Sequence, residues 1–120
     1  MTFSSHPERR PAVVTGSSSG IGAATARLLA AAGHPVVVAR PRERAGLDMA
    51  DAESIRGFAE GAVAAYGEID IVVSNAGDVV PGTSVGTDPD AFAQDITVNF
   101  LGAQRLCNSL VPAMVERGHG

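Results

Sequence analysis

The sequence predicts a small α/β domain in which a parallel sheet carries helices on both faces. Short apolar runs, rich in β-branched residues, recur at residues 12–15, 36–38 and 69–73. The segments between them have the composition or the apolar spacing of helices. Strands that alternate with helices form parallel sheets with right-handed crossovers, and 120 residues suffice for one domain.

The first half of the chain contains one strand–helix–strand unit. Residues 1–10 are polar, and we expect them to form a flexible lead. Residues 12–15 are expected to form a buried strand. The Ala- and Leu-rich residues 21–32 favour a helix, and Gly33 follows where a glycine commonly ends one. Residues 36–38, three consecutive valines, are expected to form the second buried strand.

The second half adds two further predicted strands and two helices. Residues 46–49 are a candidate third strand. Only residues 41–45 precede it, which is short for a parallel crossover, so we expect a rudimentary or displaced strand. Residues 51–66 favour a helix with an aspartate as its N-cap. Residues 69–73 are expected to form a fourth, buried strand, and residues 89–117 a long helix.

Charge and composition argue against several classes of function. The formal net charge is −4, and the nine basic residues, all arginines, form no continuous run, so we expect no nucleic-acid or membrane-surface binding. The three histidines lack partners at metal-ligand spacing, which favours no metal site. No segment has the pattern of a signal peptide or of a membrane span, so we expect a soluble cytoplasmic protein. We expect Cys107 to be buried as a small apolar side chain.

A glycine-rich turn at residues 15–22 lies between the first strand and the first helix. Gly16 permits a tight turn off the strand, Gly20 lets the backbone approach a diphosphate, and Gly22 lets the helix pack closely on the sheet. The following helix directs free N–H groups and a partial positive charge to the same place. The turn therefore indicates a dinucleotide site, with an ordinary tight turn as the alternative.

Two further motifs follow the glycine turn in order. Asn-Ala-Gly at residues 75–77 comes directly after a buried strand, and Asn99 ends a Thr-Val-Asn sequence in the long helix. Together with Thr-Gly-x-x-x-Gly-Ile-Gly at residues 15–22, these motifs resemble those of the short-chain dehydrogenase/reductase family over about residues 11–118. The resemblance implies a Rossmann-type fold, a nicotinamide dinucleotide as partner, and hydride transfer between alcohols and carbonyl compounds.

The resemblance also implies a role for particular residues. Asn99 matches the helix asparagine of the family's catalytic tetrad. Asp48 matches a carboxylate that accepts a hydrogen bond from the adenine amino group; the alternative is a loop carboxylate or a helix N-cap. Asn75 borders the nicotinamide side or is a turn residue that tolerates left-handed geometry. The implied cofactor-binding residues are Gly16, Ser18, Ser19, Gly20, Ile21, Gly22, Arg40, Asp48, Met49, Asn75, Ala76 and Gly77.

The end of the second strand distinguishes the two nicotinamide cofactors. An acidic residue there would bind the ribose 2′-hydroxyl of NAD and repel a 2′-phosphate. The sequence has Arg40 at this place, with Arg42 and Arg44 close behind. A planar guanidinium suits a phosphate, so we predict NADP(H) in preference to NAD(H). The alternative is that these arginines only face solvent.

The sequence departs from the family at its acid–base pair. In the family, a tyrosine with a lysine four residues later exchanges a proton with the substrate oxygen, and the ammonium lowers the tyrosine pKa. The only tyrosine here is Tyr66, Asp70 lies four residues later, and the sequence has no lysine. Asn99 cannot replace a phenolate base. We therefore do not expect this chain to catalyse the family's reaction by itself.

The sequence stops where the family continues into its next strand, so we expect residues 11–120 to be a partial domain, truncated after the fourth strand and the long helix. Residues 69–73 would then lie at a sheet edge, which invites pairing with another chain. Both the edge and the family's use of this helix for subunit contacts favour self-association. Apolar side chains expected to be exposed to some extent on the long helix are Leu106, Leu110, Val111 and Met114.

Three functional hypotheses are consistent with these features of the sequence. The first is a truncated NADP-dependent oxidoreductase that would act on an alcohol or carbonyl substrate when completed. The second is a non-catalytic module that binds NADP(H). The third is an interaction subunit whose partner supplies the missing half.

Overall fold

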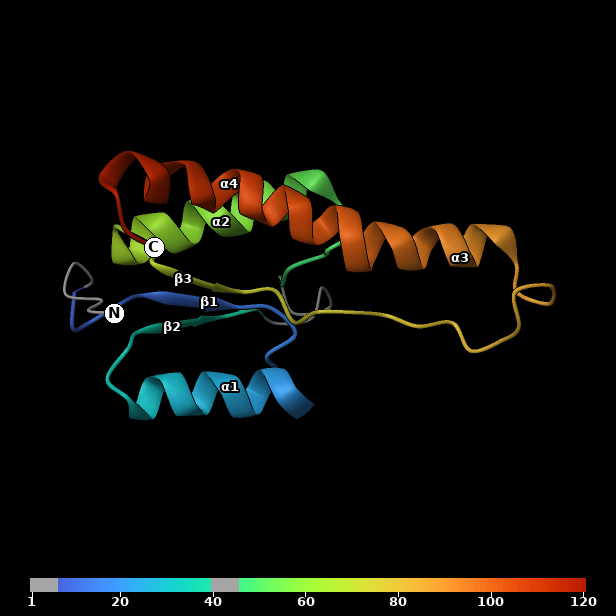
Figure 1. The fold of residues 1–120 in the computed structure, drawn as a ribbon, viewed down its shortest axis with the longest axis horizontal. Coiled ribbons are helices and arrows are strands. Elements are labelled where there is room, and N and C mark those ends of the chain that lie inside the picture. The colour runs from blue at the N-terminus through green and yellow to red at the C-terminus, as the bar shows by residue number, and fades with distance from the viewer. Residues whose placement is uncertain (1–6, 40–45) are drawn as a thin grey trace.

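The computed structural model describes residues 7–39 and 46–120, and a sheet of three parallel strands lies at its centre (Figure 1). The strands are β1 (Ala12–Val14), β2 (Val36–Val38) and β3 (Ile71–Val73). Their spatial order is β2-β1-β3, with Val13 of β1 opposite Val37 and Val72. The parallel arrangement agrees with the predicted Rossmann-type fold.

Helices cover both faces of the sheet, as the sequence predicts (Figure 1). Helix α1 (Gly20–Ala31) lies on one face, and α2 (Ala52–Tyr66) and α4 (Gly102–Arg117) pack against each other on the opposite face. All three residues of β1 have no exposed surface. A strand that is covered on both faces needs a continuous apolar sequence, which explains the unbroken run Ala-Val-Val.

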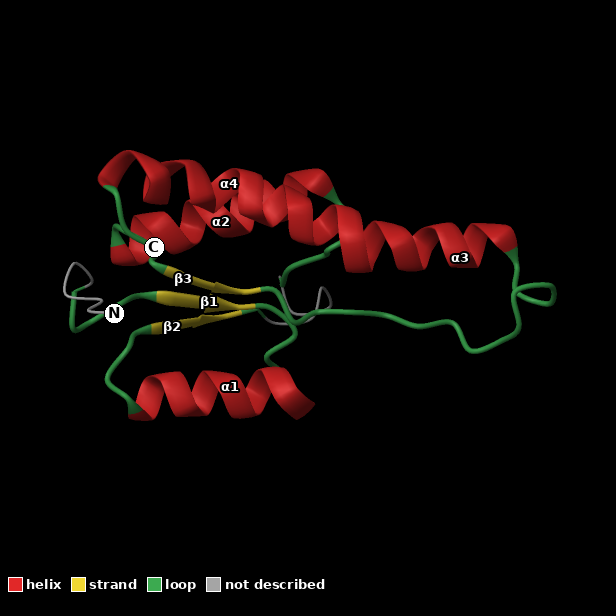
Figure 2. Cartoon of the chain, in the orientation of Figure 1, coloured by secondary structure: helices red, strands yellow, loops and turns green. Residues whose placement is uncertain are grey.

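An arm extends from the sheet beyond the layered part of the molecule. Figure 2 shows a long loop, residues 74–88, that leaves β3 and returns through α3 (Pro89–Ile96). The helix then continues through a π-helical turn, η2 (Thr97–Leu101), into α4. The predicted helix 89–117 is therefore continuous but changes its winding. The longest dimension of the molecule is 51 Å and the shortest is 27 Å.

Local sequence signals explain where the helices begin and end. The Asp51 side chain accepts a hydrogen bond from the Glu53 N–H at 3.1 Å and caps α2, as predicted. Gly67 ends α2 with φ at +78°, a backbone conformation that glycine adopts without a steric penalty. Asp88 caps α3 in the same way as Asp51 caps α2, by accepting from the Asp90 N–H.

The main core lies between the sheet and the pair α2–α4. The prediction that Leu106 and Leu110 would be partly exposed is wrong, because α4 directs both toward α2 and they are 0% and 2% exposed. Val111 is exposed and Met114 is half-buried. The buried members of the core cluster are Val13, Met49, Ile55, Ala59, Ala62, Ile69, Leu106 and Leu110.

The predicted third strand at residues 46–49 is not formed, and the sheet in the described part of the chain has three strands. Its polar groups are used locally: Asp48 N–H donates to the Ser54 hydroxyl at 2.9 Å, and Asp48 Oδ1 accepts from Ala50 N–H at 2.9 Å. The Asp48 carbonyl accepts from Asp51 N–H at 3.1 Å. These bonds form a turn that leads into α2. Because the turn uses these backbone groups locally, they are not available to pair with a neighbouring strand.

Cys107 is exposed, so the prediction of a buried thiol is wrong; on α4 it lines a surface hollow together with Val72 of β3 and Val111. In the described residues, none of the helices combines the length and the hydropathy needed to cross a bilayer. Most of the predicted N-terminal lead, residues 1–6, lies outside the described residues.

Candidate nucleotide-binding site

The glycine turn lies at the carboxyl end of β1, where the chain passes into α1. Gly16 and Gly20 have φ of +65° and +56°, in the left-handed region that other residues rarely adopt. A Cβ on Gly20 would have no neighbour within 4 Å, so the backbone here is open on its outer side. This is the geometry that a ligand needs to approach the main chain closely.

Gly22 is packed as tightly as Gly20 is open. A Cβ on Gly22 would lie 2.2 Å from the Gly16 carbonyl oxygen and 2.5 Å from the Asn75 side-chain nitrogen. No side chain fits there, so only glycine allows α1 to start directly above the turn. The predicted packing role of Gly22 therefore has a steric basis.

The amino end of α1 has the properties of an anion site. Ser19 is its N-cap but makes no side-chain capping bond, and the first turn carries no acidic residue. The first amide groups therefore lack a capping side chain, and the helix dipole adds a partial positive charge. Ser18 and Ser19 are exposed beside them, and Ile21 is 78% exposed. These residues fit the diphosphate of a dinucleotide.

Asn75 connects the second motif to the glycine turn. Its side-chain amide donates to the carbonyl oxygens of Thr15 and Gly16, both at 3.3 Å. In return, the Thr15 hydroxyl accepts from the backbone N–H groups of Asn75 at 3.1 Å and Ala76 at 3.0 Å. The carboxyl ends of β1 and β3 are therefore joined by four hydrogen bonds. The structure places residues 75–77 next to the glycine turn.

Asn99 lies in the π-helical turn η2 and contacts the same region. Its side chain makes two bonds to the backbone of Asp78, with the Asp78 N–H donating to Oδ1 and Nδ2 donating to the Asp78 carbonyl, both at 2.6 Å. A Cβ on Gly77 would lie 3.2 Å from Asn99 Oδ1. The structure thus brings Asn99 to the end of the Asn75–Gly77 motif.

The remaining implied residues occupy different environments. The Asp48 carboxylate accepts a hydrogen bond from the Ala50 N–H in the turn before α2, so it has the local role of a loop carboxylate. The Met49 side chain is 6% exposed and belongs to the core, and a Cβ on Gly102 would lie 2.5 Å from the Met49 carbonyl oxygen. Arg40, Arg42 and Arg44 lie outside the described residues. Their assignment and that of Asp48 to the cofactor remain predictions.

Two hydroxyl groups, those of Thr15 and Ser17, belong to the site although neither residue is among the predicted cofactor-binding residues. Thr15 is completely buried and bridges β1 to the residues after β3. The Ser17 hydroxyl donates to the Ala39 carbonyl at 3.3 Å and ties the turn to the end of β2. Both lie within the glycine-rich turn at residues 15–22. A hydroxyl at the end of a buried strand indicates that it has a hydrogen-bond partner, but the sequence does not reveal which distant residue that partner is.

Tyr66 lies far from these residues along the sheet. It ends α2 just before the chain enters β3, so it belongs to the amino edge of the strands, whereas the glycine turn follows the carboxyl end of β1. Its side chain is 44% exposed. The one tyrosine of the sequence is therefore not part of the candidate site.

The amino edge of the sheet carries a separate group of charges around Asp70, which is 2% exposed. Asp70 accepts from Arg10 Nε at 2.5 Å and from Arg117 at 3.3 Å, and it pairs with His119 at 2.6 Å. Burial raises the pKa of Asp70, but these hydrogen bonds outweigh it and hold the pKa at about 2. The cluster ties α4 and the residues after it to the start of β3.

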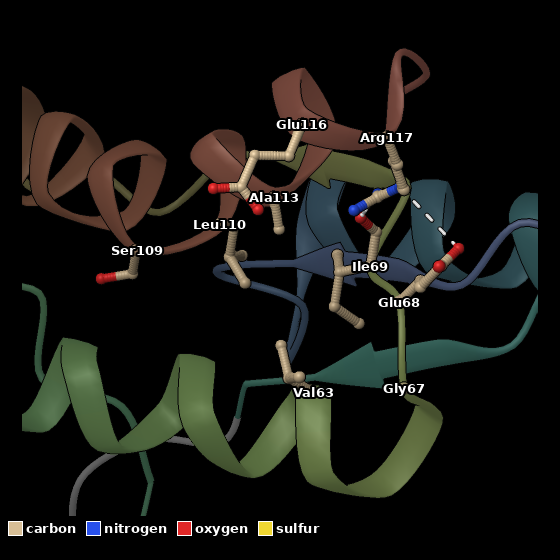
Figure 3. A pocket seen from close by; sticks show the side chains of 9 residues that line it. All are labelled: Val63, Gly67, Glu68, Ile69, Ser109, Leu110, Ala113, Glu116 and Arg117. Atoms are coloured by element: carbon tan, nitrogen blue, oxygen red, sulfur yellow. Dashed lines mark hydrogen bonds and ion pairs between the residues drawn. The ribbon is translucent and has the colours of Figure 1, made fainter.

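A pocket of about 360 Å³ opens beside this cluster, between the ends of α2 and α4 (Figure 3). Arg117 and Glu68 face each other at its rim at 3.8 Å. Val63, Ile69 and Leu110 give it an apolar floor. It lies at the opposite edge of the sheet from the glycine turn, so it is not part of the candidate nucleotide site.

The fold and the site together define a dinucleotide-binding domain of the Rossmann type: a parallel sheet between helices, with an open glycine turn leading into an uncapped helix. The sequence model of the family described as short chain dehydrogenase matches residues 10–120. The chain therefore belongs to the short-chain dehydrogenase family.

Individual relatives agree with this membership. The probable oxidoreductase EphD of Mycobacterium tuberculosis is 35% identical over 125 residues, covering 89% of this chain and 21% of that protein. The crystal structure of a short-chain dehydrogenase from Streptomyces avermitilis has 32% identity and a TM-score of 0.87, covering 93% of this chain and 47% of that one. A metagenomic short-chain oxidoreductase in complex with NADP has 35% identity and a TM-score of 0.84, covering 92% and 59%.

The chain is shorter than all of these relatives. It spans between about a fifth and a half of the length of the curated relatives that it matches. The relatives therefore contain residues that the 120 residues of this chain do not match.

Proposed function

We propose that this chain is the cofactor-binding part of an NADP(H)-dependent oxidoreductase that transfers hydride between alcohols and carbonyl compounds. One observation carries the proposal. The open backbone at Gly20 and the uncapped start of α1 lie at the same sheet edge as Asn75, which bonds directly to the glycine turn. This edge offers donors for a diphosphate and a polar surface beside it.

Each group of residues has a distinct part in the proposed site. The first amides of α1, with Ser18 and Ser19, bind the diphosphate. Residues 75–77 form the wall on the nicotinamide side, and Asn99 fixes the end of that wall through Asp78. When bound, the cofactor supplies or accepts the hydride; the residues of this chain bind it, orient it and hold its surroundings in place.

The preference for NADP(H) rests on Arg40, Arg42 and Arg44. A guanidinium forms paired hydrogen bonds with a phosphate, and no carboxylate occupies the end of the second strand in the sequence. The metagenomic relative that was solved in complex with NADP supports this preference.

Fluorescence titration of the 120-residue chain with NADPH and with NADH tests the proposal. We expect NADPH to bind more tightly than NADH, and Arg40→Ser to reduce that difference while leaving NADH binding unchanged. Binding of neither nucleotide would refute the dinucleotide site. Tighter binding of NADH would refute only the choice of cofactor.

A second candidate function is binding of NADP(H) without turnover. The position of Tyr66 at the amino edge of the strands favours it, since this tyrosine lies away from the site and the sequence has no lysine to complete the acid–base pair. Nucleotide binding without oxidation of added alcohols by the isolated chain is the expected result. Turnover by the chain alone would refute this candidate.

We also infer that the chain self-associates. Phe92, Ile96 and Phe100 follow one another at successive helical turns and are 58%, 46% and 69% exposed. In the described residues, β3 pairs with β1 on one side only. Analytical ultracentrifugation should show dimers or larger species that Ile96→Glu dissociates; a monomer at all concentrations would refute the inference.

A further inference from the structure

Asp95 and Asn99 lie one helical turn apart and hold the same loop segment, residues 78–80. Asp95 Oδ2 accepts the Val80 N–H at 2.8 Å. Asn99 makes its two bonds to the backbone of Asp78, at 2.6 Å each. Side chains of the helix thus bind alternate residues of the segment, much as a neighbouring strand would. Because the segment follows Gly77 directly, Asp95 extends the ordered wall of the nucleotide site outward along the arm.

The segment and α3 border an open hollow of about 510 Å³, a volume typical of small-molecule sites, and Phe92 on its wall is 58% exposed. Val79, Val80 and Phe92 supply its apolar surface, and hydroxyl groups from the turn before α3 supply the polar part. Among the described residues that line it, Asp95 is the sole ionisable side chain. The lining residues are Val79, Val80, Gly82, Thr83, Ser84, Thr87, Pro89, Phe92 and Asp95.

Asp95 also has unused capacity to accept hydrogen bonds. Its second carboxylate oxygen, Oδ1, is buried and has no hydrogen-bond partner among the described residues. A buried acceptor without a donor is costly, but Oδ1 has almost no accessible surface, so a ligand in the hollow would meet the negative charge of Asp95 and would not bond to this oxygen. A negatively charged ligand would be repelled, since the lining offers a carboxylate and no cation to compensate.

We propose that Asp95 is a positioning residue that fixes segment 78–80 as one wall of a hollow for the apolar body of an uncharged alcohol or ketone. This proposal rests on the proposed oxidoreductase function and narrows its substrate class to uncharged compounds. Asp95 acts through the Val80 amide, so its effect should follow its ability to accept a hydrogen bond.

The test uses the 120-residue chain, amide NMR spectra and two matched probes, cyclohexanol and cyclohexanecarboxylate. We expect cyclohexanol to shift the amide signals of Val80, Thr83 and Thr87 in a saturable manner, and cyclohexanecarboxylate to leave them unchanged. Asp95→Ala should weaken cyclohexanol binding about fivefold, as expected for the loss of one hydrogen bond, and should accelerate hydrogen exchange at the Val80 amide. Asp95→Asn keeps an acceptor oxygen and should restore both.

Controls separate this proposal from folding and from the proposed function. Asp90→Ala changes an exposed carboxylate on the same helix and should leave cyclohexanol binding unchanged. NADPH titration of the same samples reports the nucleotide site independently, so its failure would count against the proposed function and not against the hollow. Equal binding of both probes, or cyclohexanol binding that Asp95→Ala leaves intact, would overturn the proposal. The comparison of the two probes needs no variant and holds even if Asp95→Ala fails to fold.

Discussion

The side chain of Asn99 binds both backbone groups of Asp78, with each of the two hydrogen bonds at 2.6 Å. The bonds join a π-helical turn to the residue that follows Asn75-Ala76-Gly77, 21 positions earlier in the chain. A π-helical turn often marks a functional position, since it displaces one residue from the regular helical winding. The arm is therefore fastened to the sheet edge at the point where the proposed nucleotide site ends.

Asn99→Ala should release the residues after Gly77 while leaving the sheet intact. The loss of two hydrogen bonds should destabilise this contact by about 1–2 kcal/mol. Hydrogen exchange at the Asp78 amide should become faster, and NADPH binding should weaken. Asn108→Ala, an exposed asparagine in α4, is the matched control. Unchanged exchange at Asp78 would contradict the role assigned to Asn99.

Gly22→Ala should disrupt the glycine turn because the new Cβ would lie 2.2 Å from the Gly16 carbonyl oxygen. Overpacking of this kind costs about 1–3 kcal/mol, and the displaced turn should no longer bind NADPH. Gly57→Ala provides the control, since a Cβ there has no neighbour within 4 Å and a helix interior favours alanine. Thermal unfolding and NADPH titration of both variants give the comparison. A Gly22→Ala chain with normal binding would refute the steric argument.

Thr15→Val should destabilise the chain although it keeps the shape of the side chain. The hydroxyl accepts from the N–H groups of Asn75 and Ala76, and Thr15 is completely buried. The Asn75 N–H keeps the Val73 carbonyl at 3.1 Å, whereas the Ala76 N–H loses the partner it has in the folded chain, and such a buried amide costs about 1–3 kcal/mol. Thr15→Ser keeps the hydroxyl and should lose less stability in urea denaturation. Equal losses for the two variants would show that packing, and not hydrogen bonding, is the main contribution of Thr15.

The ion cluster at Asp70 should make stability depend on acidic pH. The pKa of Asp70 is lowered from 3.8 to about 2 in the folded chain, so its contribution is complete well above pH 4 and declines as the pH falls toward 2. The difference corresponds to about 2 kcal/mol. Urea denaturation between pH 6 and pH 2 should show this decline in the unmodified chain.

Asp70→Asn should remove that contribution at every pH. It leaves the partly exposed Arg10 and Arg117 without the carboxylate and should destabilise the chain at neutral pH by about 2 kcal/mol, the contribution given above. Glu68→Gln alters an exposed carboxylate that lies 3.8 Å from Arg117 and should have little effect. If Asp70→Asn kept the same acid sensitivity as the unmodified chain, other carboxylates would have to account for it.

Local patterns in the sequence were sufficient for much of the secondary structure. Three consecutive valines predict β2 with its observed bounds, and the Asp51 cap and Gly67 predict both ends of α2. Residues 46–49 were predicted wrongly, because a short apolar pattern does not reveal that Asp48 will bond to Ala50 and Ser54 in a turn. For so few residues, the choice between strand and turn depends on which partners lie nearby.

By itself, the sequence determined the class of fold, the order of the motifs and the absence of the lysine that the family's acid–base pair requires. These depend on residue type and spacing along the chain. Tertiary structure alone decided that Thr15 bonds to Asn75 and Ala76, that Leu106 faces α2, and that Asp95 and Asn99 hold one loop segment. The physical reason is that a hydrogen bond or a buried face needs two partners, and these partners are brought together only when residues distant in the sequence pack around one sheet.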